Sequence, residues 1–173
     1  EKNMDGYQNS VRAVMRAAGA RRLRGVLGPV STILKVEPGC EVAIETALGG
    51  ALQNIVVENE AAAKAAIALL RNDHAGRATF LPLDTVQPGV FRGRLSGTAR
   101  LASALVQADP RYENIVSNLL GRIIVVEDIN EASRVARDNG YHNKVVTMDG
   151  QVINAGGSFT GGSVQRSAGL FTR

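Results

Sequence analysis

The chain has 173 residues, 20 Lys and Arg against 16 Asp and Glu, and a formal net charge of +4. Hydrophobic residues make up 45% and charged residues 21% of the chain, proportions typical of a globular protein rather than a disordered one. Aromatic residues make up only 4% and Trp is absent, so few side chains could stack on bases or sugars. The charge permits contact with a polyanion without requiring it.

The cysteine content and the hydropathy of the chain indicate the cellular compartment in which the protein is expected. A single cysteine, Cys40, excludes an intrachain disulfide, and no apolar run approaches the roughly 20 residues that a membrane span needs. We therefore expect a soluble cytoplasmic protein with no membrane contact. The chain opens on Glu-Lys-Asn-Met without a signal-peptide pattern, which we interpret as an excised fragment.

In the first half of the chain the hydrophobic pattern predicts alternating helices and strands. Apolar residues from Met4 to Ala18 are spaced by three and four, which fits both a coiled-coil seam and an ordinary amphipathic helix. Residues 26–36 are predicted to be extended, with Gly28-Pro29 marking an edge strand or a bend. Further predicted elements are a helix over 42–52, a strand covered on both faces over 55–57, a helix over 61–71 and a strand over 78–81.

The second half carries clearer helix boundaries. Asp109-Pro110 predicts a helix start and Gly121 its end. A strand is predicted over 123–126, and Asp128 with Glu131 resembles a capping box that opens a helix running to Gly140. Two strands, 145–148 and 151–153, are predicted to form a hairpin in which Asp149-Gly150 makes a two-residue type I′ turn.

The two halves repeat one pattern. The segments Leu48-Gly49, Ile55-Val56-Val57-Glu58 and Glu60-Ala61 correspond to Leu120-Gly121, Ile124-Val125-Val126-Glu127 and Glu131-Ala132. Each half thus repeats a helix-strand-helix-strand unit. We predict a mixed α+β fold of two related small lobes, joined by a connector over residues 87–97 that is rich in glycine and proline.

Four glycines lie within eight residues near the C-terminus, at Gly156, Gly157, Gly161 and Gly162. A phosphate-binding loop is one interpretation, but Gly162 occupies the position of the required lysine. A flexible linker is the second. In the third, glycine is needed because another strand or subunit approaches too closely for a Cβ atom.

Residues suited to catalysis or metal binding are few. The chain has one cysteine and two histidines, His74 and His142, and no metal-ligand spacing. Each histidine fits a solvated residue at a helix end better than a ligand. We therefore expect neither an enzyme nor a metal site nor a cofactor.

Basic residues cluster in two short segments. Arg21, Arg22 and Arg24 form the first, and Arg92, Arg94 and Arg100 form the second. Such clusters are compatible with solvated surface and with contact to nucleic-acid phosphates. Because no helix-turn-helix, zinc finger or aromatic platform accompanies them, we expect no reading of base sequence.

Four stretches of the chain follow one another in a characteristic order. They are Gly6-Tyr7 with Val11-Arg12-Ala13-Val14, residues 43–57, residues 76–84, and Val146-Thr147-Met148-Asp149-Gly150 leading into the glycine motif. Together they resemble the hinge of bacterial structural maintenance of chromosomes (SMC) proteins. The resemblance covers essentially the whole chain. It implies a coiled-coil stub over 1–20, a first lobe with the connector over 21–97, a second lobe over 98–165 and the start of a returning coil over 166–173.

The resemblance implies a non-enzymatic homodimerisation hinge that joins two SMC subunits for chromosome condensation and segregation at the nucleoid. The ATPase heads of the family are absent from this chain. In that family a strand of the second lobe adds to a sheet of the partner's first lobe. The dimer contact it implies comprises Gly156, Gly157, Ser158, Phe159, Thr160, Gly161, Gly162 and Ser163.

The resemblance also implies non-specific DNA contact through basic surface. Candidate residues are Arg21, Arg22, Arg24, Arg92, Arg94 and Lys144. The alternative is a small α/β regulatory domain that binds a nucleotide or metabolite and uses the glycine segment as an anion nest.

Overall fold

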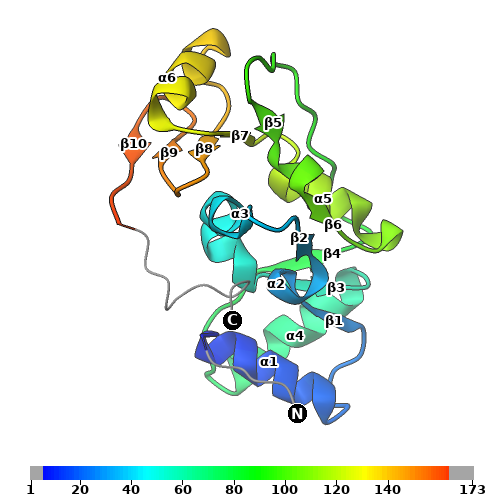
Figure 1. Ribbon diagram of the computed structural model, residues 1–173. Coiled ribbons are helices and arrows are strands. Elements are labelled where there is room, and N and C mark those ends of the chain that lie inside the picture. The colour runs from blue at the N-terminus through cyan, green and yellow to red at the C-terminus, as the bar shows by residue number, and fades with distance from the viewer. Residues whose placement is uncertain (1–5, 164–173) are drawn as a thin grey trace. The chain divides into compact units, whose positions relative to one another are not determined.

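The computed structural model describes residues 6–163 and divides the chain into two compact units, here called lobe 1 and lobe 2 (Figure 1). Lobe 1 combines Glu1–Ile33 with Gly50–Gln87, and lobe 2 combines Leu34–Gly49 with Pro88–Arg173. This division differs from the predicted one, in which residues 21–97 formed one lobe. The reason is that residues 34–49 make their sheet and helix contacts with lobe 2.

Lobe 1 is built on a three-stranded sheet. Its elements are α1 (Asn9–Gly19), β1 (Val26–Pro29), α2 (Val30–Ile33), η1 (Gly49–Gln53), β3 (Ile55–Val57), α4 (Glu60–Asn72) and β4 (Phe80–Pro82). The strand order is β1-β3-β4, with β3 antiparallel to β1 and parallel to β4. The central strand β3 is buried along its whole length, as its wholly apolar sequence predicts.

Helix α1 packs on the core of lobe 1. Val11, Val14 and Ala17 on its apolar face join a buried cluster with Ala66 and Leu70 of α4. This contact explains the three-four spacing as an amphipathic helix over the part of the segment that is described. Residues 1–5 and 164–173 lie outside the described residues, so the coiled-coil stub and the returning coil stay predictions.

The segment predicted as extended over 26–36 changes conformation at Pro29. Strand β1 ends there, and α2 follows in place of a continuous strand. The hydroxyl of Thr32 donates to the carbonyl of Pro29 at 2.8 Å, and Val30 N donates to the carbonyl of Asn54 at 2.9 Å. As Pro29 predicts, β1 is an edge strand, because proline cannot donate a ladder hydrogen bond.

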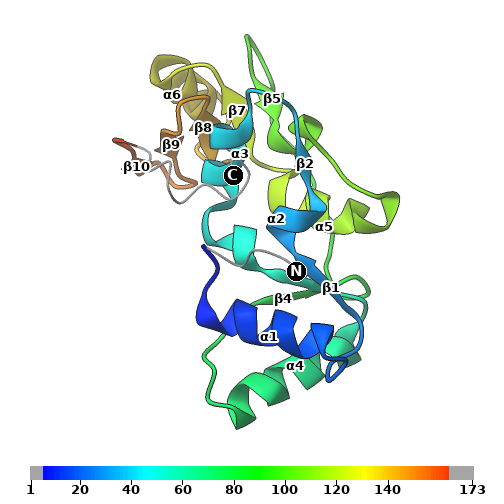
Figure 2. The ribbon, with the colours of Figure 1, turned by 60° about the horizontal axis from the view of Figure 1, so that its bottom comes forward.

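Lobe 2 holds a larger sheet and a two-stranded ribbon (Figure 2). Its elements are β2 (Lys35–Val36), α3 (Glu41–Leu48), β5 (Arg100–Leu101), η2 (Ala102–Leu105), β6 (Val106–Gln107), η3 (Pro110–Tyr112), α5 (Glu113–Leu120), β7 (Ile124–Val126), α6 (Ile129–Asp138), β8 (Val145–Thr147), β9 (Val152–Ile153) and β10 (Phe159–Thr160). The five-stranded sheet has the order β10-β9-β8-β7-β5, and β2 pairs with β6.

The predicted helix starts in lobe 2 are confirmed. The Asp109 carboxylate accepts from Arg111 N at 3.0 Å, and the Asp128 carboxylate accepts from Glu131 N at 2.9 Å. The predicted capping box is modified, because Glu131 accepts from Glu127 N at 3.3 Å, one residue before the N-cap.

The predicted hairpin of β8 and β9 is confirmed, but its turn type was wrong. Thr147 N donates to Gln151 O at 2.9 Å, which leaves a three-residue loop, and only Gly150 in it has a positive φ, of 90°. A type I′ turn needs positive φ at both central residues, and Asp149 does not have it. The Thr147 hydroxyl supports the longer loop by donating to the Asp149 carboxylate at 2.5 Å and accepting from Gln151 N at 2.9 Å.

The predicted internal repeat is present in the topology. The units β3-α4-β4 and β7-α6-β8 each join two parallel strands through a helix, and β1 and β5 each add an antiparallel neighbour. Asn59 and Asp128 cap the two helices in the same way, each accepting from the residue three positions on. Ala62 therefore corresponds to Glu131, and the predicted pairing of Glu60 with Glu131 was wrong by two residues.

Candidate functional site

The glycine motif forms the outermost strand of the lobe 2 sheet. Strand β10 pairs antiparallel with β9, with Phe159 opposite Ile153 and Thr160 opposite Val152. Figure 1 shows it as the orange strand at the end of that sheet. The glycines lie on both sides of this short strand, at Gly156 and Gly157 before it and at Gly161 and Gly162 after it.

Hydrogen bonds fix the turn that leads into β10. Gly156 N donates to Tyr141 O at 2.8 Å and Gly157 N donates to Asn154 O at 2.9 Å, with φ angles of 93° and 103°. The Asn154 amide reaches the hydroxyls of Ser158 and Thr160 at 3.2 and 3.1 Å. The segment is therefore an ordered turn and strand rather than a flexible linker.

The side chain of Gln151 holds the end of the motif. Its amide nitrogen donates to Gly162 O at 3.0 Å and its amide oxygen accepts from Gly162 N at 2.8 Å. A Cβ atom on Gly161 would collide with this amide. A Cβ atom on Gly162 would have space, but the φ of 129° at this position is unfavourable for residues other than glycine. Glycine is thus required at position 161 by the side chain of Gln151 in the same chain, a contact that the sequence does not reveal.

The main chain of Phe159 faces away from its own sheet. Asn154 N donates to Ser158 O at 2.7 Å, so residues 154 and 158 form a hydrogen-bonded pair. Because such pairs alternate with non-bonded ones in an antiparallel ladder, the N–H and C=O of Phe159 point to the open edge. Its side chain is 60% exposed, the most exposed large hydrophobic side chain among the described residues.

An anion nest at this motif would need main-chain N–H donors. Those of Gly156, Gly157 and Gly162 are already bonded to Tyr141 O, Asn154 O and the Gln151 side chain. These bonds disfavour the phosphate-binding interpretation.

Lobe 1 has an open strand edge at β4. Ile55 N donates to Thr79 O at 2.9 Å and Leu83 N donates to Val57 O at 3.0 Å, so the odd-numbered residues of this segment bond to β3. The N–H and C=O of Phe80 therefore face the other side, where no strand within residues 6–163 pairs with β4. Pro82 also lies on this strand, a residue that sheets tolerate at edges.

The first basic segment is exposed and lies in lobe 1. Arg21, Arg22 and Arg24 follow α1, and the Arg22 guanidinium lies 3.7 Å from the Asp73 carboxylate. Arg21 adopts a positive φ of 63°. The three arginines line one surface hollow, so the structure brings them together as the sequence predicts.

The second basic segment lies in lobe 2, where the connector is anchored to α6. The Asn139 side chain accepts from Arg94 N at 2.7 Å and donates to Arg94 O at 3.0 Å. Arg92 and Arg94 line a hollow of about 950 Å³ together with Arg122 and His142. Arg122 was not among the residues predicted from the sequence, because its approach to Arg92 and Arg94 depends on how the connector folds back over the helix ends.

Lys144 is placed apart from these arginines. Its Nζ donates to Ala47 O at 3.0 Å, in the last turn of α3, and burial lowers the pKa of its ammonium group. This interaction within lobe 2 gives Lys144 a structural role and reduces its availability for DNA.

The remaining candidates carry little chemistry. Burial raises the pKa of the Cys40 thiol, which keeps it protonated. Over residues 6–163, no three His, Cys, Asp or Glu side chains are grouped so that they could hold a metal ion. No helix within the same range is long and apolar enough to cross a membrane.

Comparison with known proteins assigns the family. The family model described as "SMC proteins Flexible Hinge Domain" matches residues 23–136. The chain belongs to the SMC hinge family. It is similar to the Chromosome partition protein Smc of Desulfitobacterium hafniense, with 39% identity over 96% of this chain, and to that of Bacillus subtilis, with 37% identity over 95%. It spans 14% of the length of each relative.

Solved structures of SMC hinges share the fold. The hinge domain of Geobacillus stearothermophilus, described as an asymmetric dimer, has a TM-score of 0.88 and 36% identity, and the match covers 97% of this chain and 69% of that chain. The Pyrococcus furiosus hinge domain has a TM-score of 0.73 and 28% identity over 94% of this chain and 92% of that chain. The predicted family and the α+β fold are confirmed.

Proposed function

We propose that this chain is a non-enzymatic homodimerisation hinge that joins two SMC subunits through their main chains. The observation that carries the proposal is the outer edge of β10, where the N–H and C=O of Phe159 are directed away from β9. An exposed strand edge is a template for a strand of another chain.

The acceptor that we propose is β4 of the partner's lobe 1. In the internal repeat β4 corresponds to β8, whose outer edge is covered by β9. Among the described residues the equivalent edge of β4 is uncovered, so lobe 1 lacks the covering strand that lobe 2 has, while β10 adds an open edge to lobe 2. Two copies related by a two-fold axis would satisfy both edges twice. Lasting interfaces of this type bury about 2,000 Å² or more in total.

The dimeric hinge of Geobacillus stearothermophilus supports this proposal through its similarity to the chain. In the longer protein we propose that the join serves chromosome condensation and segregation, in the cytoplasm and at the nucleoid. Catalysis of ATP hydrolysis would belong to parts of that protein outside this chain.

We further propose that the hinge contacts DNA without reading its sequence. The exposed arginines of the two basic segments, Arg21, Arg22 and Arg24 in lobe 1 and Arg92 and Arg94 in lobe 2, would bind phosphates. Arg122 joins the second group because it lines the same hollow. Lys144 is the weakest of the candidates, since its ammonium group is bonded to Ala47 O.

The dimer is tested by Phe159→Pro, which removes the outward N–H and leaves the bonds between β9 and β10 in place. We expect the dissociation constant of the dimer to rise at least tenfold, measured by light scattering over a concentration series. Phe159→Ala is the matched control, because it removes the ring and keeps the N–H. A folded Phe159→Pro variant that keeps the wild-type dimer population contradicts main-chain pairing at β10.

DNA binding is tested separately with Arg92→Ala combined with Arg94→Ala. We expect weaker binding to every duplex sequence and a flatter dependence of log affinity on log salt, by roughly 0.9 for each phosphate that the variant no longer neutralises. Arg100→Ala is the control. Arg100 does not line the hollow that Arg92 and Arg94 share, and its guanidinium lies 3.5 Å from the Glu37 carboxylate. Weakening confined to one duplex sequence would contradict backbone contact.

A further inference from the structure

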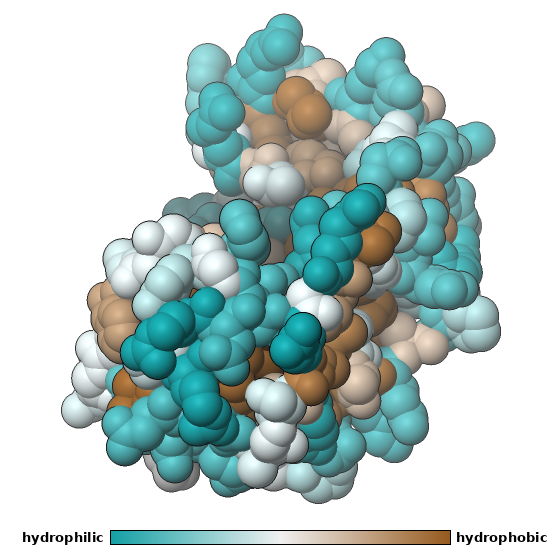
Figure 3. Space-filling model, turned by 90° about the horizontal axis from the view of Figure 1, so that it is seen from above, coloured by the Kyte–Doolittle hydropathy of each residue, from teal (hydrophilic) through white to brown (hydrophobic). Residues whose placement is uncertain are grey.

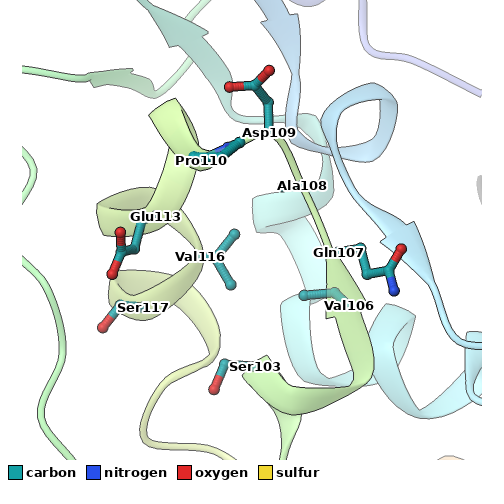
Figure 4. A pocket seen from close by; sticks show the side chains of 9 residues that line it. All are labelled: Ser103, Val106, Gln107, Ala108, Asp109, Pro110, Glu113, Val116 and Ser117. Carbon is teal, nitrogen blue, oxygen red and sulfur yellow. The ribbon is translucent and has the colours of Figure 1, made fainter.

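A groove of about 570 Å³ lies in lobe 2 between strand β6 and helix α5 (Figure 4). It is formed by elements other than the glycine motif and other than the two basic segments. One wall is the strand and the residues that follow it, and the other is the first half of the helix.

The strand wall presents main chain that is free to pair. Within the described part of the chain, strand β6 pairs only with β2, through Lys35 opposite Gln107 and Val36 opposite Val106. Glu37 N donates to Leu105 O at 2.8 Å, which makes residues 37 and 105 a hydrogen-bonded pair. By alternation the N–H and C=O of Val106 point away from β2, to the side where Val106 and Ala108 line the groove.

The interior of the groove is apolar. The side chains of Val106 and Val116 point toward one another across it in Figure 4, and Ala108 and Pro110 add further apolar lining. Both valines are only partly buried, so an occupant would remove apolar surface from water. On the face shown in Figure 3, by comparison, hydrophilic residues predominate and apolar ones form small groups.

The charge of the groove is opposite to that of the chain. Its charged lining residues are Asp109 and Glu113, both exposed, and no Lys or Arg lines it although the chain carries 20 of them. The nearby Arg111 lies over the ring of Tyr112, with its guanidinium carbon 5.6 Å from the ring centre. An acidic groove repels nucleic acid and attracts a basic ligand.

We infer that this groove binds an extended, basic segment of a partner protein, which adds as a strand to β6. The main chain of the segment would pair with Val106, its apolar side chains would contact Val106 and Val116, and its Lys or Arg side chains would face Asp109 and Glu113. This combination of main-chain pairing and side-chain pockets is the usual mode of strand addition. The inference is independent of the proposed dimer contact at β10.

The probe for this site is a fluorescein-labelled peptide of eight residues in which Lys and Val alternate. We expect saturable binding to the wild-type chain by fluorescence anisotropy, with amide shift changes at Val106 and Ala108 by nuclear magnetic resonance. Asp109→Asn combined with Glu113→Gln should weaken binding at least fivefold. Asparagine retains the helix cap, so the variant should fold.

The matched control is Glu127→Gln combined with Asp128→Asn, which makes the same charge change at the cap of α6. We expect it to bind the peptide as the wild type does. The same peptide with N-methyl groups on alternate main-chain nitrogens should lose binding, because one edge can no longer pair. An alternating Glu and Val peptide should not bind.

Three results of the peptide-binding tests would overturn the inference. They are an absence of saturable binding up to about 1 mM peptide, equal weakening by the two double variants, and undiminished binding of the N-methylated peptide. Loss of the dimer in the Asp109→Asn, Glu113→Gln variant would assign the groove to contact between copies and would also overturn it. A failure at Phe159→Pro concerns β10 alone and leaves this test unaffected.

Discussion

Lobe 1 and lobe 2 are built on the same strand-helix-strand unit but complete it differently. In lobe 2 the strand β8 is followed by β9 and β10, which extend the sheet, whereas in lobe 1 the sheet ends at β4. The repeat therefore produces two unequal sheets, one with an added strand edge and one without its cover. Under the proposed pairing, this inequality, rather than either lobe alone, provides complementary edges for association with a second copy.

The two lobes also differ around the glycine that precedes the first strand of each sheet. Gly25 lies before β1, and a Cβ atom there would be 3.1 Å from the methyl group of Ala62. Gly97 lies before β5 in a similar conformation, and its Cβ would be 2.5 Å from a carboxylate oxygen of Glu131. The methyl group of Ala62 in lobe 1 thus corresponds to the buried carboxylate of Glu131 in lobe 2.

Glu131 uses this position to hold the connector. Only 8% exposed, its carboxylate accepts from the N–H of Thr98 at 2.8 Å, from the Thr98 hydroxyl and from Glu127 N. Together with the Asn139 bonds to Arg94, these interactions hold the connector at residue 94 and directly after its end at residue 98, on the C-terminal side of Arg92. Residues 88–97 of the connector belong to lobe 2, and the bonds of Arg94 to Asn139 and of Thr98 to Glu131 attach them to α6 and its C-terminal cap.

The largest expected effect tests the shared part of the two lobes. Ile55 and Ile124 occupy matching positions in β3 and β7 and are both fully buried. Replacing either with alanine should lower the free energy of unfolding by about 2–5 kcal/mol, through lost burial and the cavity left behind. Urea denaturation measures both, and a decrease below about 1 kcal/mol in one lobe would show that its core is not equivalent.

The next effect tests the carboxylate that distinguishes lobe 2. Glu131→Ala introduces the residue that lobe 1 has at Ala62 and leaves the N–H groups of Thr98 and Glu127 without their acceptor. We expect the free energy of unfolding to fall by about 2 kcal/mol, since a hydrogen bond to a charged group contributes about 1.5–3 kcal/mol. Glu60→Ala is the control, because Glu60 is exposed and forms a surface ion pair with Lys64. Similar decreases in both variants would contradict the anchoring role.

The same residue should make stability depend on pH. The hydrogen bond from the Thr98 hydroxyl, the largest cause, lowers the pKa of Glu131 below its ordinary value. A lowered pKa in the folded state stabilises the protein above the unfolded-state pKa of about 4.3, and the stabilisation is lost as the pH falls through the folded-state pKa. The stability gap between wild type and Glu131→Gln should therefore narrow between pH 7 and pH 3, measured by urea denaturation. An equal difference in unfolding free energy between the two proteins at pH 7 and pH 3 would contradict a lowered pKa of Glu131.

The smallest effect tests a feature that the lobes share. Asn59→Ala and Asp128→Ala each remove the N-cap of the corresponding helix, α4 or α6. Each should cost about 1 kcal/mol in unfolding free energy, and the two decreases should agree closely. A decrease at Asp128 more than twice that at Asn59 would indicate that the cap also supports the hydrogen bonds of Glu131. Thermal unfolding of the wild type and of both variants measures the two decreases.

The sequence predicted those parts of the fold that depend on local chemistry. The wholly apolar strands at 55–57 and 124–126, the capping carboxylates at Asp109 and Asp128, and the edge position of Pro29 all follow from neighbouring residues. The predicted type of the turn after Thr147 was wrong, because the hydroxyl of Thr147, rather than the Asp-Gly pair alone, determines the length of the loop.

Contacts between distant residues could not be predicted. Nothing in the local sequence indicates that Gln151 bonds to Gly162, that Asn139 holds Arg94 or that Lys144 donates to Ala47 O. The candidate site was found because clustered glycines are unusual, but the outward direction of Phe159 depends on the register between β9 and β10. Register is a tertiary property, since a shift of one residue would turn these groups inward.

The open edges of β10 and β4 have a consequence for mixtures of variants. Under the proposed pairing, a Phe159→Pro chain lacks a competent β10 and a Phe80→Pro chain lacks a competent β4, because each loses its outward N–H. Neither chain alone could form an intact interface with its own kind. When both are combined, β10 of the second chain would meet β4 of the first, with both defects confined to the opposite interface. Such a pair would regain half of the wild-type bonding, so complementation between two defective chains would reveal how many strand pairings hold one dimer together.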